Sequence, residues 1–201
     1  MVQKSICGEL LGNVCCHIQT VGMKYFSDDL QDDALKRYGR SYLLLGALEL
    51  IVRKKMIVAL SNFTEEKGYT TWHEWFEFSD TKSPYLLRAI NQAKSQGLRD
   101  NVSIESQLPL SFWRYLLISK HYSNLWLPTL HLVFPELEAP KARNSFHYIS
   151  EKMGKALDLR NRVAHYNFYK ISIIDAEEAN LKSIISAMGE ELVETEAGIE
   201  S

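Results

Sequence analysis

Cysteine is scarce in this chain of 201 residues, and its three cysteines all lie close to the N-terminus. Cys7, Cys15 and Cys16 do not form two Cys-x-x-Cys pairs. This distribution argues against a disulfide framework and against a structural zinc site. We therefore expect a reducing compartment, of which the cytoplasm is the simplest.

Long apolar runs are also missing. The longest one, over residues 43–52, is interrupted by Glu49 and has about half the length that a membrane-spanning helix needs. The first 22 residues show no basic start followed by a continuous apolar stretch and a small-residue cleavage site. We expect no membrane contact and no export signal.

The chain has no excess of basic residues, because 23 Lys and Arg side chains stand against 25 Asp and Glu side chains. The formal net charge of -2 excludes nonspecific binding of nucleic acid over the whole surface. Any contact with RNA should therefore be local and should lie in a cleft. Hydrophobic residues make up 46% of the chain, which is enough for one sizeable core.

Several motifs that carry metal or cofactor chemistry are absent from the sequence. It contains no His-Glu-x-x-His, no glycine-rich phosphate loop and no nucleophile elbow around a serine. His121, His131 and His147 have no helical partner at the spacing that metal ligands need. We expect neither a metal site nor a cofactor.

Apolar residues recur at helical spacing along most of the chain, and no strand-period pattern or internal repeat is convincing. We predict an all-α bundle with one helical domain over residues 25–188. Residues 1–24 form a lead-in, and the acidic residues 189–201 should be a disordered tail. The expected helices are 28–37, 42–60, a short one capped by Thr71, 84–96, 109–121, one after Pro140 and 174–188, with a loop over 98–107.

The most distinctive stretch is Arg-Asn-Arg-Val-Ala-His at residues 160–165, late in the helix expected after Pro140. Arg160 is predicted to fall within that helix's apolar stripe, where a charge is costly unless it is paired or lies beside a polar cleft. We expect Arg160 to face an anion, a partner subunit or a carboxylate. Asn161 and His165 are four residues apart and share a neighbouring face. The stripe comprises Phe146, Ile149, Met153, Ala156, Leu157, Val163 and Ala164.

An Arg-Asn-x-x-x-His pattern on a late helix of an all-helical chain resembles the HEPN superfamily, and most of all its bacterial Abi-like (abortive infection) proteins. The resemblance covers roughly residues 25–185 and rests on three features in order: residues 43–55, an apolar helix with a charged end; 111–113, Ser-Phe-Trp; and 160–165. It implies a HEPN-like bundle, a homodimer and metal-independent ribonuclease activity. It also implies a role in phage defence or as a toxin, with an antitoxin or another regulatory protein as a further partner.

Cleavage of RNA without a metal needs a base for the 2′-hydroxyl, a cation for the phosphate and an acid for the leaving 5′-oxygen. His165 can act as base or acid, since a histidine exchanges protons near neutral pH. Arg160 suits the phosphate because its planar guanidinium makes paired hydrogen bonds and stays charged. Asn161 can orient His165 or hydrogen-bond the phosphate. The expected products carry 2′,3′-cyclic phosphate and 5′-hydroxyl ends, and DNA should resist.

Arg160 and His165 lie about 140° apart around a regular helix, so one copy of the motif does not present both groups side by side. Two motifs that face each other across a two-fold axis would build a shared cleft. Arg162, Tyr166 and Tyr169 would flank that cleft and contact the substrate. A surface position for Arg162 and a packing role for Tyr166 are the plain alternatives.

Other interpretations remain open at this stage. The same basic groove could bind RNA or a nucleotide without cutting it, or bind a partner protein, and Arg160 could instead be neutralised inside a scaffold by a carboxylate such as Glu49. Two other clusters have a functional and a plain interpretation. The basic run 53–55 is a phosphate site or a solvated face. The aromatic cluster Trp72, Trp75, Phe76 and Phe78 is a base-stacking surface or part of the core.

Overall fold

A computed structural model describes residues 28–78, 83–96, 101–165, 174–195 and 198–200, and the expected lead-in over residues 1–24 lies outside them. Within these ranges the side chains are described except at 28–34, 78, 101–103 and 193–200. The chain divides into two compact units, Met1–Arg37 and Tyr38–Ser201. The core and the sites described below belong to the second unit.

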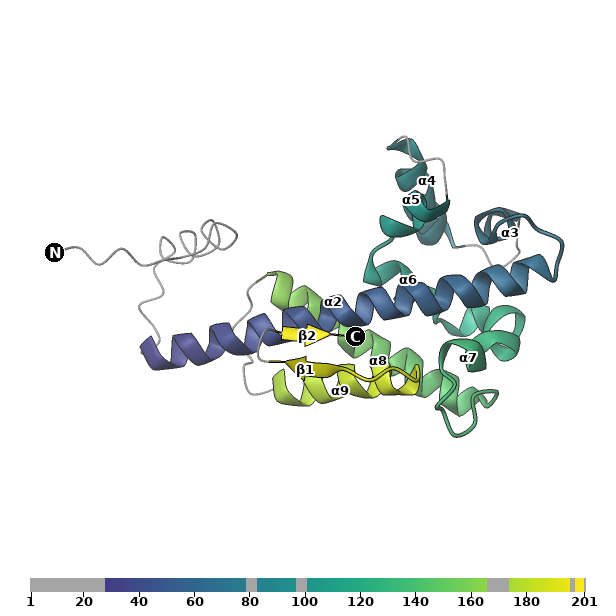
Figure 1. Ribbon diagram of the computed structural model, residues 1–201. Coiled ribbons are helices and arrows are strands. Elements are labelled where there is room, and N and C mark those ends of the chain that lie inside the picture. Colours follow the sequence, from purple (N-terminus) through teal and green to yellow (C-terminus); the bar gives the residue numbers. More distant parts are fainter. Residues whose placement is uncertain (1–27, 79–82, 97–100, 166–173, 196–197, 201) are drawn as a thin grey trace. The chain divides into compact units, whose positions relative to one another are not determined.

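The predicted all-α fold is confirmed (Figure 1). In the described part of the chain the regular structure is helical apart from one short hairpin. The elements are α2 (Asp28–Glu65), α3 (Trp72–Phe78), α4 (Pro84–Ser95), α5 (Asn101–Ser106), α6 (Leu110–Leu116), the 3-10 helix η1 (Ser119–His121), the π-helix η2 (Tyr122–Trp126), α7 (Leu127–Val133), α8 (Arg143–Ala164), α9 (Ile174–Ala187), β1 (Val193–Thr195) and β2 (Gly198–Glu200).

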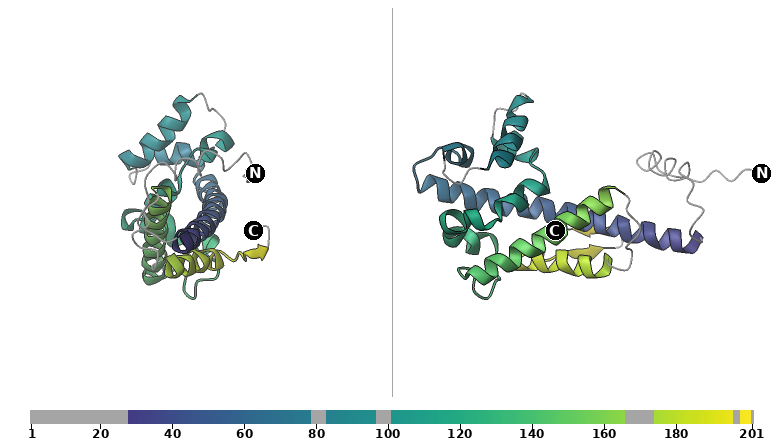
Figure 2. Two further views of the ribbon diagram at one scale, coloured as in Figure 1. Left: turned by 90° about the vertical axis from the view of Figure 1, so that its left-hand side faces the viewer. Right: turned by 180° about the vertical axis from the view of Figure 1, so that it is seen from behind.

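Helix α8 contacts several of the other elements. It packs along α9 (Figures 1 and 2). It also contacts α6 and η2. Helix α4 packs on α6 and contacts α3 and α5. The carboxyl-terminal half of α8 therefore lies near the α4–α6 pair on one side and against α9 on another.

Apolar side chains at a helical period of 3.6 hold α8 in place. Each large apolar side chain that leaves water stabilises the fold by roughly 1.5–3 kcal/mol. Their spacing also sets the rotation of α8 about its own axis. The buried members are Phe146, Ile149, Met153, Ala156, Leu159 and Val163.

Two predicted helix starts are confirmed in detail. The backbone N–H of Glu74 donates to the Thr71 hydroxyl at 3.1 Å, and the Glu74 carboxylate accepts from the backbone N–H of Thr70 at 3.1 Å. The Thr71 contact satisfies one donor that the first turn of α3 leaves free, and the Thr70 contact holds the segment just before the helix. Pro84 opens α4, where its fixed φ suits the first helical turn.

A buried carboxylate ties α2 to α9 within the second unit. The Ser41 hydroxyl donates to one oxygen of Glu178 at 3.1 Å, and Arg40 reaches the other oxygen at 3.3 Å. Only 8% of Glu178 is exposed, so its charge needs these partners. The two contacts link segments that are far apart in the sequence.

The expected break between the helices 28–37 and 42–60, at Gly39, is wrong, because α2 runs from Asp28 to Glu65. A glycine inside a helix costs about 1 kcal/mol relative to alanine, and the buried side chains of the second half of α2 outweigh that cost. The expected loop over 98–107 is also wrong in part, since α5 occupies Asn101–Ser106. Burial of Ile104 and a 2.7 Å hydrogen bond from the Trp72 indole N–H to Glu105 fix that short helix.

The helix expected over 109–121 ends early, at Leu116. Side chains satisfy the carbonyls that this ending leaves free. The Trp126 indole N–H donates to the Leu116 carbonyl at 2.6 Å, and Ser150 and Arg114 donate to the Leu117 carbonyl at 2.6 and 3.1 Å. The chain can therefore turn through η1 and η2 before α7 begins.

The acidic segment expected to be disordered contains the hairpin of β1 and β2. The strands are antiparallel, with Val193 opposite Glu200 and Thr195 opposite Gly198. Valine and threonine favour extended backbone, and this local preference competes with the self-repulsion of the acids. Before it, Gly189 follows α9 with a φ of 73°, a conformation that favours glycine.

Among the described helices, none combines the length and the continuous apolar character that crossing a bilayer requires.

His121 is a polar side chain at the centre of the core. It is fully buried, its ring lies 6.2 Å from the Phe76 ring, and neither ring nitrogen has a hydrogen-bond partner among the described residues. Burial, together with the nearby charge of Lys120, lowers the pKa of His121 from 6.5 to about 4. The native protein therefore holds this histidine neutral at neutral pH.

This lowered pKa predicts a loss of stability in mild acid. Below about pH 6.5 the unfolded chain binds a proton at His121 that the native protein does not bind until about pH 4. The free energy of unfolding should therefore fall between these values, by roughly 3 kcal/mol in total, and level off below them. Urea unfolding at a series of pH values measures this slope. His121→Phe should flatten it, and identical slopes in both proteins would contradict the account.

Candidate functional site

The carboxyl-terminal end of α8 carries the three residues predicted to be catalytic, but Arg160 does not lie in the apolar stripe. Leu159 and Val163 are the buried residues there, and Arg160 and Asn161 are exposed. The predicted position of Arg160 is therefore wrong by one residue. A period of 3.6 allows either Leu159 or Arg160 to lie on the apolar stripe, and the structure buries Leu159. Arg160 is exposed, so its guanidinium does not need a charged partner inside the core.

Arg160 and Asn161 instead converge on one surface cavity of about 170 Å³. The Arg160 guanidinium donates to the Asn161 side-chain oxygen at 3.5 Å, which aligns the two groups. A cation beside an amide presents hydrogen-bond donors to any anion in the cavity. The remaining wall residues are Leu157 of α8 and four residues from α4 and from α6 with its start: Tyr85, Pro109, Ser111 and Tyr115.

Two tyrosines form one wall of this cavity. The rings of Tyr85 and Tyr115 have centroids 4.7 Å apart and are tilted by 59°. The Tyr85 hydroxyl and the Ser111 hydroxyl are hydrogen-bonded at 3.0 Å, which fixes the Tyr85 ring across from α6. Both residues are nearly half exposed, with values of 47% for Tyr85 and 44% for Tyr115. Exposed and fixed aromatic rings are surfaces on which a planar group can stack.

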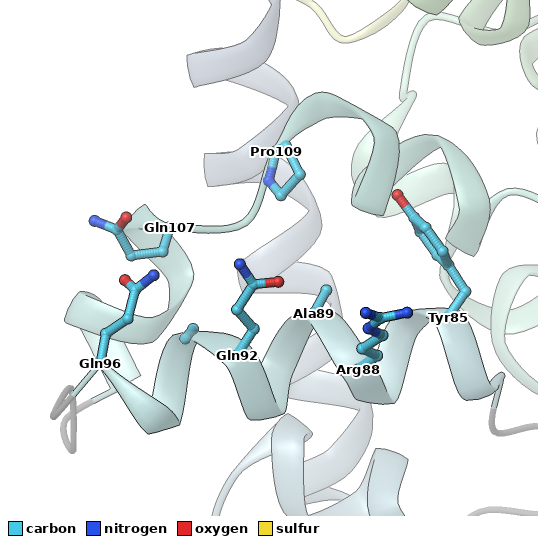
Figure 3. A pocket seen from close by; sticks show the side chains of 8 residues that line it. Tyr85, Arg88, Ala89, Gln92, Gln96, Gln107 and Pro109 are labelled. Atoms are coloured by element: carbon cyan, nitrogen blue, oxygen red, sulfur yellow. The ribbon is translucent and has the colours of Figure 1, made fainter.

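A second, larger cavity of about 350 Å³ adjoins the first, since Tyr85 and Pro109 line both. Its polar lining consists of one guanidinium and three side-chain amides. Figure 3 shows side chains that project from the same side of α4, with residues of the α5–α6 segment across from them: Tyr85, Arg88, Gln92 and Gln96 from the helix, Gln107 and Pro109 from the segment. We call the two cavities together the α4 groove.

Arg162 points elsewhere. Its guanidinium donates to Glu177 of α9 at 3.0 Å, and only 25% of the Arg162 side chain and 14% of the Glu177 side chain are exposed. The predicted role of Arg162 as a substrate contact at the Arg160 site therefore lacks support in the described geometry. Arg162 instead joins α8 to α9.

His165 caps α8 and is exposed. Its backbone N–H donates to the Asn161 carbonyl at 3.1 Å, so the residue sits one turn beyond the cavity. His165 is not among the described residues that line the cavity with Arg160. The structure thus brings Arg160 and Asn161 together and leaves His165 beside them. Tyr166 and Tyr169, also predicted to contact substrate, lie outside the described residues.

The open alternatives for other clusters are decided by burial and pairing. Glu49 binds Arg53 at 3.1 Å, so the suggestion that Glu49 neutralises Arg160 is wrong. Lys55 is paired with Glu190 at 2.8 Å. Two residues of the basic run, Arg53 and Lys55, are therefore already paired with carboxylates. The aromatic cluster belongs to the core, since Trp72, Trp75 and Phe76 are buried, while the Phe78 side chain is outside the described set.

In the described ranges, no group of three or more His, Cys, Asp or Glu side chains is arranged to hold a metal ion.

Sequence reasoning missed the α4 contribution to the site. Tyr85, Arg88 and Gln92 follow a helical period of three to four residues on the polar face of α4. That pattern is typical of any solvated face, so it did not distinguish a groove. Tyr115 has an apolar ring at helical spacing from Phe112, so its sequence position suggests burial, although nearly half of it is exposed.

No protein-family model, curated protein or solved structure matches this chain.

The contact between Arg162 and Glu177 predicts a structural role that can be separated from RNA binding. Arg162→Ala should lower the free energy of unfolding by about 1–2 kcal/mol, because it leaves the mostly buried Glu177 carboxylate without its Arg162 partner. Chemical denaturation of Arg162→Ala, Glu177→Gln and the double variant measures the coupling. Additive effects would contradict the account. An equal loss of RNA binding in the folded Arg162→Ala and Arg160→Ala proteins would also contradict it.

Proposed function

We propose that this protein is a metal-independent endoribonuclease of HEPN type. The observation that supports this proposal best is the convergence of Arg160 and Asn161 on a surface cavity at the end of α8, one turn before His165. A guanidinium can stabilise the phosphate charge and an imidazole can act as base and acid, and these are the roles that such cleavage needs. The resemblance of residues 160–165 to the HEPN ribonuclease pattern points to the same chemistry.

The proposed reaction is a transfer within the RNA strand. One imidazole takes the proton of a 2′-hydroxyl, the 2′-oxygen forms a bond to the adjacent phosphorus, and the bond from phosphorus to the 5′-oxygen breaks. The imidazolium formed in the first step returns its proton to the leaving 5′-oxygen, so the products are a 2′,3′-cyclic phosphate and a 5′-hydroxyl. Arg160 stabilises the charge that develops on the phosphate oxygens. Asn161 orients the Arg160 guanidinium through their hydrogen bond, and its own side-chain N–H can donate to the phosphate.

The proposal includes a homodimer. Within one chain His165 does not line the cavity that Arg160 lines, so a complete site needs the imidazole of another chain. Two α8 ends related by a two-fold axis would place the Arg160 cavity of one protomer beside the partner's His165, and the symmetry would create two such sites.

A second candidate is an RNA-binding or nucleotide-binding module that does not cleave, or a platform for a partner protein. The separation of His165 from the Arg160 cavity favours this candidate, because the cavity has binding groups of its own. From the resemblance alone, the setting of either activity is phage defence or a toxin system in the cytoplasm, with an antitoxin or another regulatory protein as partner. Neither candidate requires a cofactor.

The two candidates predict different results with purified protein and total RNA in EDTA. The ribonuclease produces fragments with 2′,3′-cyclic phosphate ends, and single-stranded DNA stays intact because it lacks the nucleophile. His165→Ala should reduce the rate by about 10²–10⁴-fold and Arg160→Ala by about 10²–10³-fold. End analysis of the products by gel electrophoresis and phosphatase treatment measures both effects.

Arg143→Ala is the matched control, because Arg143 is an exposed arginine at the opposite end of the same helix. It should cleave like the wild type, and circular dichroism should show all three variants folded. A folded His165→Ala protein that cleaves at the wild-type rate would refute the assignment. RNA that binds but is never cut by the wild type would leave the binding module as the function.

A further inference from the structure

The α4 groove extends from the Arg160 cavity along the whole length of α4, and its lining has a consistent chemistry. From Tyr85 to Gln96 the helix rises by about 16 Å. Among the described lining residues the groove has two arginines, Arg88 and Arg160, and no acidic side chain. In a chain whose acids outnumber its basic residues, 25 to 23, an acid-free groove with two guanidiniums is a local exception. The groove is therefore suited to a negatively charged ligand.

The other lining groups narrow the class of ligand. Side-chain amides at Gln92, Gln96 and Gln107 each offer both donors and an acceptor, which match the edges of nucleobases. A phosphate alone would use only the donors. The exposed rings of Tyr85 and Tyr115 add a stacking surface between the amides and Arg160. Stacked rings, base-edge amides and phosphate-binding guanidiniums together are the chemistry of single-strand recognition.

We infer that the α4 groove binds a single-stranded segment of RNA. Bases stack on Tyr85 and Tyr115, base edges meet the amides of α4, and Arg88 contacts the backbone. At a stacked spacing of about 3.4 Å, the helix length accommodates roughly five nucleotides. A duplex does not fit this use, because its bases are already stacked and their edges are paired.

The inference deepens the proposed function and rests on it in one respect: the groove leads to Arg160, so the bound strand would continue into the cleavage site. Binding can nevertheless be measured without cleavage. A fully 2′-O-methylated RNA of about ten nucleotides keeps its bases and phosphates but lacks the attacking hydroxyl. Fluorescence anisotropy with this probe reports the groove alone.

Arg88→Ala should raise the Kd of the probe about tenfold, because it removes a charge-assisted contact. Lys54→Ala is the control, since it removes the same charge from an exposed position on α2, outside the groove. It should leave the Kd within about twofold of the wild type, which excludes an effect of net charge. An equal change in Arg88→Ala and Lys54→Ala would overturn the inference.

Tyr85 offers a second pair of variants. Tyr85→Ala should weaken binding by about fivefold or more through loss of stacking, whereas Tyr85→Phe keeps the ring, loses only the hydrogen bond to Ser111 and should bind like the wild type. Equal weakening by both variants would overturn the stacking role. Equally tight binding of a duplex of the same sequence, or of a polyglutamate peptide, would overturn the single-strand assignment.

RNA binding in the α4 groove and ribonuclease activity can be refuted independently of each other. If the wild type never cleaves RNA but Arg88→Ala and Tyr85→Ala lose the probe, the groove stands and the proposed activity falls. If cleavage depends on His165 while the Arg88→Ala protein binds the probe normally, the activity stands and the groove falls. If both proposals are correct, Arg88→Ala should raise KM about tenfold and leave kcat within about twofold of the wild type. This result is expected when a contact stabilises the bound substrate and the transition state equally.

Discussion

Burial of one side of α8 fixes the direction of every polar group in the motif. Leu159 and Val163 enter the core, and this rotation turns the residues between them outward in different directions. Arg160 and Asn161 face the α4–α6 pair, whereas Arg162 faces α9 and is held by Glu177. Three consecutive polar residues therefore meet two different environments. Their roles follow from the packing of α8 more than from their chemical types.

Much of the fold could be predicted from periodicity alone, and the site only in part. The all-α class, the start of α4 at Pro84, the end of α9 near Met188 and the Thr71 cap all follow from the local sequence pattern. Periodicity places Leu159 and Arg160 equally well on the apolar stripe, because a period of 3.6 admits steps of three or four residues. The preference of the core for leucine resolves the choice, and with it the environment of the motif.

The α4 groove could not be predicted from the sequence, because it depends on tertiary packing. Tyr85, Arg88 and Gln92 form an ordinary polar helix face when α4 is considered alone. They border the Arg160 site only because α4 packs on α6 and α6 packs on α8. The aromatic cluster of α3 shows the converse: its residues suit base stacking in the sequence, yet Trp72 and Phe76 fill the core. Burial decides which aromatic side chains remain accessible to a ligand.

The same rotation of α8 leaves Arg160 and His165 apart within one chain, so the proposed ribonuclease depends on two chains. Mixing two inactive proteins, Arg160→Ala and His165→Ala, tests this dependence most directly. After subunit exchange, half of the dimers are mixed, and one of the two sites in each mixed dimer has both intact residues. The account predicts about a quarter of wild-type activity in an equimolar mixture. A mixture as inactive as its components, with exchange verified, would contradict the two-chain site.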